Sequence, residues 1–98
     1  MASTRFNVLA SDAVLTRFRA EIDRVRKAGK LPEVEPLLRK IFSGLALIPE
    51  EMGEGRAPLP GLRLQQRVVF LAPVVVHYAV NLEEHVVWIQ SVQIRFSP

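Results

Sequence analysis

Hydrophobic residues in the first half of the chain recur at intervals of three and four, which is the spacing of one helix face. Before them, an alternating stretch at 5–10 predicts a short strand. Ser11 supplies a side-chain oxygen that can cap a helix, and Gly29 is the residue type that commonly ends one. The apolar positions between them are Leu15, Phe18, Ile22 and Val25. We therefore expect a strand followed by a first helix.

A second helix is predicted to begin between Pro32 and Pro36, because proline is tolerated best in a first turn. Its apolar face comprises Leu37, Leu38, Ile41, Phe42 and Leu45. The short connection at 29–31 makes the two helices antiparallel neighbours, a helical hairpin. Three glycines and three prolines lie within 49–61, so this segment is predicted to be a loop.

Valine and isoleucine are concentrated in the last third of the chain, in short runs separated by turn residues. These runs predict strands at 62–71, 74–81 and 86–96, joined as hairpins. The order β-α-α-β-β-β predicts an α+β fold of two layers, with the helical hairpin packed on a mainly antiparallel sheet. A length of 98 residues predicts one domain that spans 1–98.

The composition excludes several classes of protein. Hydrophobic residues make up 49% of the chain and charged residues 23%, which is typical of a globular protein and not of a disordered one. The absence of cysteine excludes disulfide scaffolds and thiolate metal sites. The longest nearly apolar stretch, 68–80, is too short to span a bilayer, and the N-terminus lacks the apolar core of a signal peptide. We expect a soluble, cytoplasmic protein with no cofactor, no bound metal and no membrane partner.

The net charge of +3 is unevenly distributed, and ten of the 13 basic residues are arginines. Segment 17–30 holds six cations and two anions, whereas segment 33–54 holds two cations and five anions. Arginine suits bidentate contacts to phosphate or carboxylate. The basic stripe on the first helix is therefore interpreted either as an ordinary solvated face or as a surface for RNA or an acidic protein.

Polar residues alternate with apolar ones along the predicted strands, and this parity indicates which face of the sheet is wet. If the helices cover the apolar face, the residues expected on the open face are Arg63, Arg67, His77, Gln93 and Arg95. Such a face could hold a phosphodiester, because guanidinium groups bind its charge and an imidazole titrates near neutrality. The same residue types also keep an ordinary sheet face soluble, so both interpretations stay open.

Other site types find little support in the chain. Trp88 is expected in the core, with a stacking platform for a nucleic-acid base as the alternative. Gly53 and Gly55 are not followed by the lysine and helix of a phosphate-binding loop. His77 and His85 have no carboxylate in metal-ligand register, so no metal site is expected.

The order of elements resembles the RelE/ParE toxin superfamily of bacterial toxin–antitoxin pairs over nearly the whole chain. Segment 58–64 (PLPGLRL) is similar to the loop and basic strand that follow the second helix of that family. Segments 76–80 (VHYAV) and 86–92 (VVWIQSV), separated by a short acidic turn, are similar to its closing hairpin.

The resemblance implies the toxin component of a type II pair, neutralised by a cognate protein antitoxin. In the branch that cleaves mRNA on the ribosome, basic residues position and stabilise the scissile phosphate while the 2′-hydroxyl attacks. By position, Arg95 matches a basic residue just past the last core strand, and Arg63 and Arg67 match basic residues of the first hairpin strand. These three are the catalytic residues that the resemblance implies. Another branch poisons DNA gyrase without this catalytic set.

Two departures from the family pattern keep the alternatives open. Segment 74–76 is all valine where the family usually has an arginine, and 96–98 lacks the histidine or tyrosine that many active members carry after the last strand. The sequence therefore allows an mRNA endoribonuclease, a gyrase inhibitor, or a non-enzymatic module that binds RNA or protein.

Overall fold

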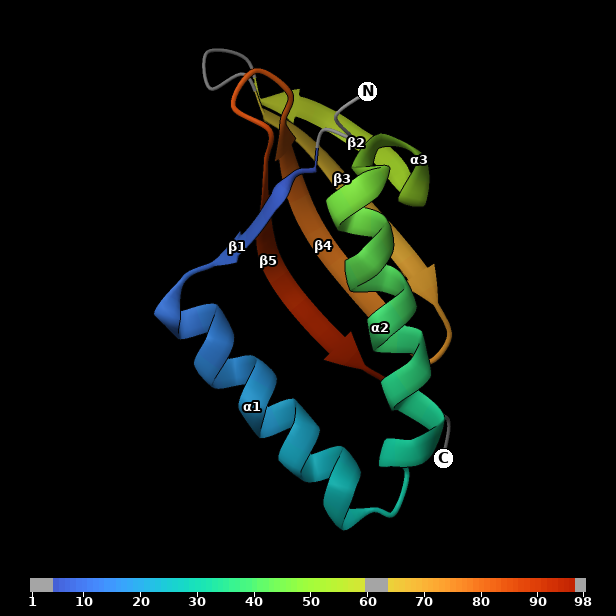
Figure 1. Ribbon diagram of the computed structural model, residues 1–98. Coiled ribbons are helices and arrows are strands. Elements are labelled where there is room, and N and C mark those ends of the chain that lie inside the picture. The colour runs from blue at the N-terminus through green and yellow to red at the C-terminus, as the bar shows by residue number, and fades with distance from the viewer. Residues whose placement is uncertain (1–4, 60–63, 97–98) are drawn as a thin grey trace.

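The computed structural model describes residues 5–59 and 64–96. The described residues form three helices: α1 (Asp12–Lys27), α2 (Leu31–Leu47) and α3 (Pro49–Met52). They form five strands: β1 (Asn7–Ala10), β2 (Glu54–Leu59), β3 (Leu64–Leu71), β4 (Val74–Asn81) and β5 (Val86–Ile94). The helices pack on one face of the sheet (Figure 1), so the predicted α+β class is confirmed.

The strands form one sheet in the order β1-β5-β4-β3-β2. β1 runs parallel to β5, and each of the other neighbouring pairs is antiparallel, as the sequence predicts for most of the sheet. The first and last strands of the chain therefore lie side by side (Figure 1).

The first helix is capped at both ends, as its sequence predicts. The Ser11 side-chain oxygen accepts a hydrogen bond of 3.2 Å from the backbone N–H of Val14. Gly29 adopts a φ of 73°, a left-handed conformation in which a Cβ atom is unfavourable. The second helix begins at Leu31, slightly earlier than predicted, with Pro32 in its first turn and Pro36 inside it.

The loop predicted at 49–61 is wrong over its described part, which contains α3 and β2. Pro49 begins α3 at a position where the missing N–H costs no helical hydrogen bond. β2 is an edge strand that pairs with β3, and its register shifts between Gly55 and Pro58. An edge position and an irregular register are the circumstances in which a strand tolerates glycine and proline.

The two long helices diverge from the turn at Gly29 on the face of the sheet that they cover (Figure 1). The rings of Phe18 on α1 and Phe42 on α2 meet edge to face, with centroids 5.9 Å apart. The core lies between the helices and the sheet, and its fully buried side chains include Val25, Val34, Ile41, Leu45, Val76, Tyr78 and Val87. The predicted helical hairpin is therefore present, but it is open.

Candidate functional site

The structure places Arg67 on the helix-covered face of the sheet, away from His77 and Arg95. Arg67 lies directly opposite Tyr78 in the β3–β4 register, whereas His77 lies opposite Val68 on the other face. Arg67 donates a hydrogen bond to the carbonyl of Gly53, and its Nε atom is buried without a hydrogen-bond partner. This guanidinium therefore holds the segment between α3 and β2 against the sheet.

Tyr78 is the second anchor of the same segment. Its side chain is fully buried, and its hydroxyl donates a 2.7 Å hydrogen bond to the carbonyl of Pro49. Burial raises the pKa of Tyr78, because it disfavours the phenolate more than the neighbouring Arg67 guanidinium favours it. The hydroxyl thus stays protonated and acts as a donor to α3.

The expected open-face set is therefore only partly assembled. Arg63 lies outside the described residues. Arg95 is exposed just after β5, and it donates a 2.6 Å hydrogen bond to the side-chain oxygen of Gln93. His77 faces the same side, between Val68 and Ser91 on the flanking strands. Of the three predicted catalytic arginines, Arg95 is the one that the described structure presents on this face.

The predicted core position of Trp88 is wrong: its side chain is 43% exposed on the face opposite the helices. The cause is a shift of register between β4 and β5. Tyr78 pairs with Ile89 and His77 pairs with Ser91, so Gln90 is an extra residue in β5. This bulge reverses the side-chain parity, and Trp88 therefore shares a face with Ser91 and Gln93.

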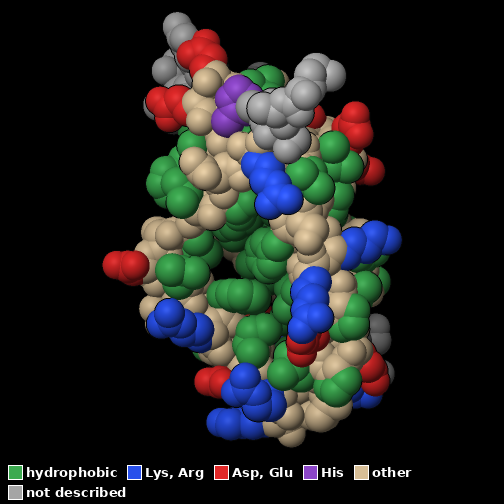
Figure 2. All heavy atoms as spheres, in the orientation of Figure 1, with side chains coloured by type: hydrophobic (Ala, Val, Ile, Leu, Met, Phe, Trp, Pro, Cys, Tyr) green, Lys and Arg blue, Asp and Glu red, His purple; other side chains and the backbone are tan. Residues whose placement is uncertain are grey.

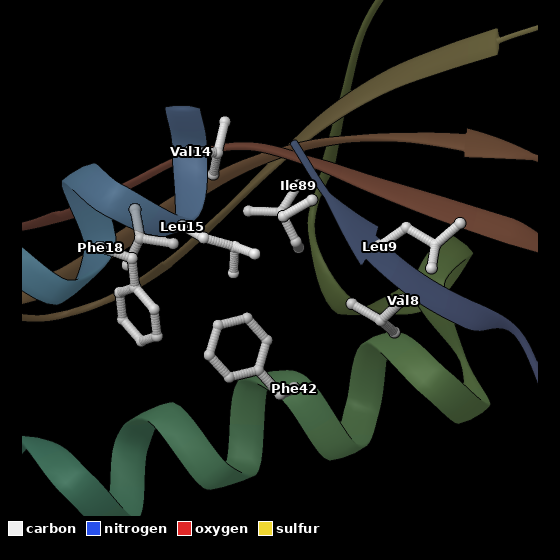
Figure 3. A pocket seen from close by; sticks show the side chains of 9 residues that line it. Val8, Leu9, Val14, Leu15, Phe18, Phe42 and Ile89 are labelled. Carbon is white, nitrogen blue, oxygen red and sulfur yellow. The ribbon is translucent and has the colours of Figure 1, made fainter. Parts of the chain in front are cut away.

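An apolar hollow of about 340 Å³ lies between the diverging helices, above β1 and β5. Its lining residues include Val8, Leu15, Phe18, Phe42, Ile89 and Val92. Figure 3 shows Leu15 and Phe18 from α1 and Phe42 from α2 around this space, with Ile89 at the sheet. We call this hollow the interhelical groove. The sequence assigns several of its side chains to the core, but the divergence of the helices leaves them accessible.

Basic residues flank the interhelical groove. Arg19 follows the groove-lining Leu15 of α1 by four positions, about one helical turn, and Arg26 follows Ile22, which packs against the core, by the same spacing. Arg26 pairs with Asp23 at 2.9 Å, whereas Arg19 makes no ion pair within the described residues. Figure 2 shows the hollow lined by hydrophobic side chains, with Lys and Arg side chains beside it.

Glu21 and Arg24 attach the C-terminal half of α1 to the end of β5. The Ile94 N–H donates a 3.0 Å hydrogen bond to the Glu21 carboxylate, and Arg24 donates to the Ile94 carbonyl. Glu21 and Arg24 also pair with each other at 3.1 Å. Partial burial opposes ionisation of Glu21, but the bonds from Arg24 and Ile94 outweigh it and lower the pKa of that carboxyl. One wall of the groove is thereby held in position.

Within residues 5–59 and 64–96, no group of three or more His, Cys, Asp or Glu side chains is placed to hold a metal ion. No helix in this part of the chain is long and apolar enough to cross a membrane.

No protein-family model matches the chain, and no curated protein or solved structure matches it significantly.

Proposed function

We propose that this chain is the toxin-like member of a type II toxin–antitoxin pair, and that a protein antitoxin neutralises it by binding in the interhelical groove. The observation that carries the proposal is the groove itself, which is apolar inside and flanked by cations. A groove of this kind suits the apolar face of an amphipathic helix, whose acidic residues would lie against the arginines. The element order, in which a strand and two long helices precede a short third helix and four antiparallel strands, keeps the resemblance in outline and supports the same assignment.

An mRNA endoribonuclease is the less favoured toxin activity. Arg67 is engaged by the carbonyl of Gly53 under the helices, and it therefore supports the fold rather than a phosphate site. Of the three arginines, Arg95 is the one that the described residues present in an exposed position on the open face. A toxin that acts by binding its target, as the gyrase branch does, requires no assembled catalytic set.

A non-enzymatic binding module is the second candidate, and the same groove supports it. The two candidates differ in what the free protein does to a cell. A toxin stops growth when it is expressed without its partner, whereas a binding module without toxicity leaves growth unchanged.

Expression of the chain from an inducible promoter in a bacterial host tests the proposal. We expect growth arrest, and we expect recovery when the small acidic protein encoded beside the chain is expressed with it. Leu15→Glu places an anion inside the groove at a 38% exposed position and should weaken the antitoxin by at least about tenfold. Leu47→Glu, at a 49% exposed position outside that groove, is the matched control.

Normal growth at high expression of the wild-type protein would contradict the toxin assignment and favour the binding module. Equal neutralisation of the Leu15→Glu and Leu47→Glu variants would place the antitoxin elsewhere.

A further inference from the structure

Within the described residues, no helix covers the other face of the sheet, where apolar side chains lie beside polar ones such as Gln66, Ser91 and Gln93. The β3–β4 register places Val68 and Phe70 on this face, beside His77 and Val75 of β4. The bulge in β5 adds Trp88 to them. Phe70 is 67% exposed and Trp88 is 43% exposed, although both are large hydrophobic side chains. An exposed apolar patch that continues across neighbouring strands commonly marks an interaction surface.

The aromatic side chains follow one diagonal of this face. Phe70 lies opposite Val75, and His77 is two residues further along the same strand. Trp88 lies opposite Ala79, again two residues beyond His77. Diagonal neighbours of this kind lie about 7–8 Å apart, within reach of aromatic side chains. Phe70, His77 and Trp88 therefore follow one diagonal of this face, which we call the open-face band.

The charges on the open face indicate which partner it suits. The charged residues that the described structure places on this face are Arg95, exposed just after β5, and Glu54, exposed on β2 opposite Val68. A nucleic acid requires an excess of cations at its binding surface, and an acidic protein does too. The open face has no such excess among the described residues, although the whole chain carries a net charge of +3. The charges that the described residues place on this face are therefore balanced, and a surface with apolar side chains and one charge of each sign complements them.

We propose that the open face binds the same face of a second copy of this chain, to form a two-fold symmetric dimer. In such a pair, each open-face band covers the other, and Arg95 of one copy can meet Glu54 of the other because the two charges lie on different borders of the face. Two sheets stacked face to face pack about 10 Å apart. This inference does not depend on the proposed toxin function.

The size of the open face fits a reversible dimer. Four strands at a spacing of about 4.8 Å, each about 25 Å long, cover roughly 500 Å² per copy, or about 1,000 Å² for the pair. That area is close to the lower limit for a specific interface. We therefore expect association in the micromolar range, with monomer at low concentration.

Sedimentation of the full chain between about 1 µM and about 200 µM tests the dimer. The wild-type protein should pass from the mass of a monomer to that of a dimer. Phe70→Glu should shift the dissociation constant upward by at least about tenfold, because it buries two unpaired charges in the interface. Leu47→Glu, an equally drastic change at the end of α2, should leave the dissociation constant unchanged.

Cross-linking tests the geometry, since the chain has no cysteine of its own. His77→Cys at the centre of the open face should give a cross-linked dimer with a bis-maleimide whose spacer is about 10 Å long. Thr16→Cys, on the exposed side of α1, should not. Circular dichroism of each variant checks that the fold is retained.

Three results would overturn the proposal. They are a wild-type chain that stays monomeric at about 200 µM, equal dissociation constants for wild type and Phe70→Glu, and cross-linking at Thr16→Cys in place of His77→Cys. Binding of a single-stranded oligonucleotide by a monomeric wild type, lost in Trp88→Glu, would instead assign the open-face band to nucleic acid. The growth assay tests the proposed function independently of the dimer measurements, so one proposal can be contradicted while the other holds.

Discussion

Arg67 on β3 lies directly opposite Tyr78 on β4, and both side chains are on the face of the sheet that the helices cover. From this shared position, Arg67 reaches the carbonyl of Gly53 and Tyr78 reaches the carbonyl of Pro49. The pair ties both ends of α3 to the centre of the sheet. A residue that the sequence assigns to phosphate binding is thereby part of the structural framework.

Replacement of Tyr78 by Phe should reduce the free energy of unfolding by about 1–2 kcal/mol. The change removes the hydroxyl that donates to Pro49 and leaves a carbonyl without that partner beside a buried ring. Urea denaturation of the two proteins measures the difference. Thr16→Ala on the exposed side of α1 is the control, and it should stay within about 0.5 kcal/mol of wild type. Equal stability of Tyr78→Phe and wild type would mean that this bond contributes nothing.

Arg67→Ala should destabilise the protein by about 1–3 kcal/mol, because the Gly53 carbonyl loses a charged donor and the side chain leaves space beneath α3. Urea denaturation measures this change as well. We expect the exposed Arg39→Ala, on the surface of α2, to have a much smaller effect. If both variants were equally stable, Arg67 would be free to serve a ligand instead.

Arg95→Ala should leave the free energy of unfolding within about 0.5 kcal/mol of wild type, because Arg95 is exposed and its guanidinium donates a hydrogen bond to the Gln93 side chain at the surface. If the open face binds an RNA phosphate, the same change should weaken RNA binding by roughly tenfold to a hundredfold. Titration with a labelled RNA measures that affinity, and Arg19→Ala on α1 is the control. Unchanged affinity and full toxicity in both variants would show that Arg95 handles no phosphate.

Glu21 should make stability depend on pH. Its pKa is lower in the folded chain than in the unfolded chain, so its contribution is present above the unfolded value, about 4.5, and is lost as the pH falls through the folded value. The difference in unfolding free energy between wild type and Glu21→Gln should therefore be largest near neutral pH and should shrink toward about pH 3. Urea denaturation at both pH values measures it. A difference that does not change with pH would contradict the assigned role of the carboxylate.

Gly53→Ala should cost about 1–3 kcal/mol or more, whereas Gly55→Ala should cost much less. A Cβ atom at Gly53 would press into the backbone carbonyl of Val68, which is fixed in the sheet. The nearest atom to a Cβ at Gly55 is a guanidinium nitrogen of Arg67 at 3.5 Å, an ordinary contact. Thermal unfolding of the two variants compares them directly. Similar melting temperatures would show that β2 can move away from β3 at little cost.

Local sequence was sufficient for much of the fold. The spacing of Leu15, Phe18 and Ile22, with Ser11 before them and Gly29 after them, predicts α1 because helix periodicity and capping act within a few residues. The strands of the last third are predicted for a similar reason, since β-branched residues prefer extended backbone wherever they occur.

Tertiary structure decided which side chains of those strands face the helices and which face solvent. In β3, the expected open-face position of Arg67 implies by alternation that Phe70 faces the helices, and this is wrong: the pairing with β4 buries Val69 and leaves Phe70 exposed. In β5, one extra residue at Gln90 moves Trp88 from the predicted core to the open face. β2 is a strand because the edge of β3 offers it hydrogen bonds, although its own residues favour a loop.

The sequence by itself thus determined which segments are helices and which are strands, apart from the segment from Pro49 to Leu59. Tertiary structure alone decided that Arg67 supports the fold, that Phe70 and Trp88 meet solvent, and that the helices leave a groove between them. The physical reason is the separation along the chain over which each kind of interaction acts. Periodicity and capping depend on neighbours along the chain, whereas strand register, a bulge and the angle between two helices depend on contacts between distant residues.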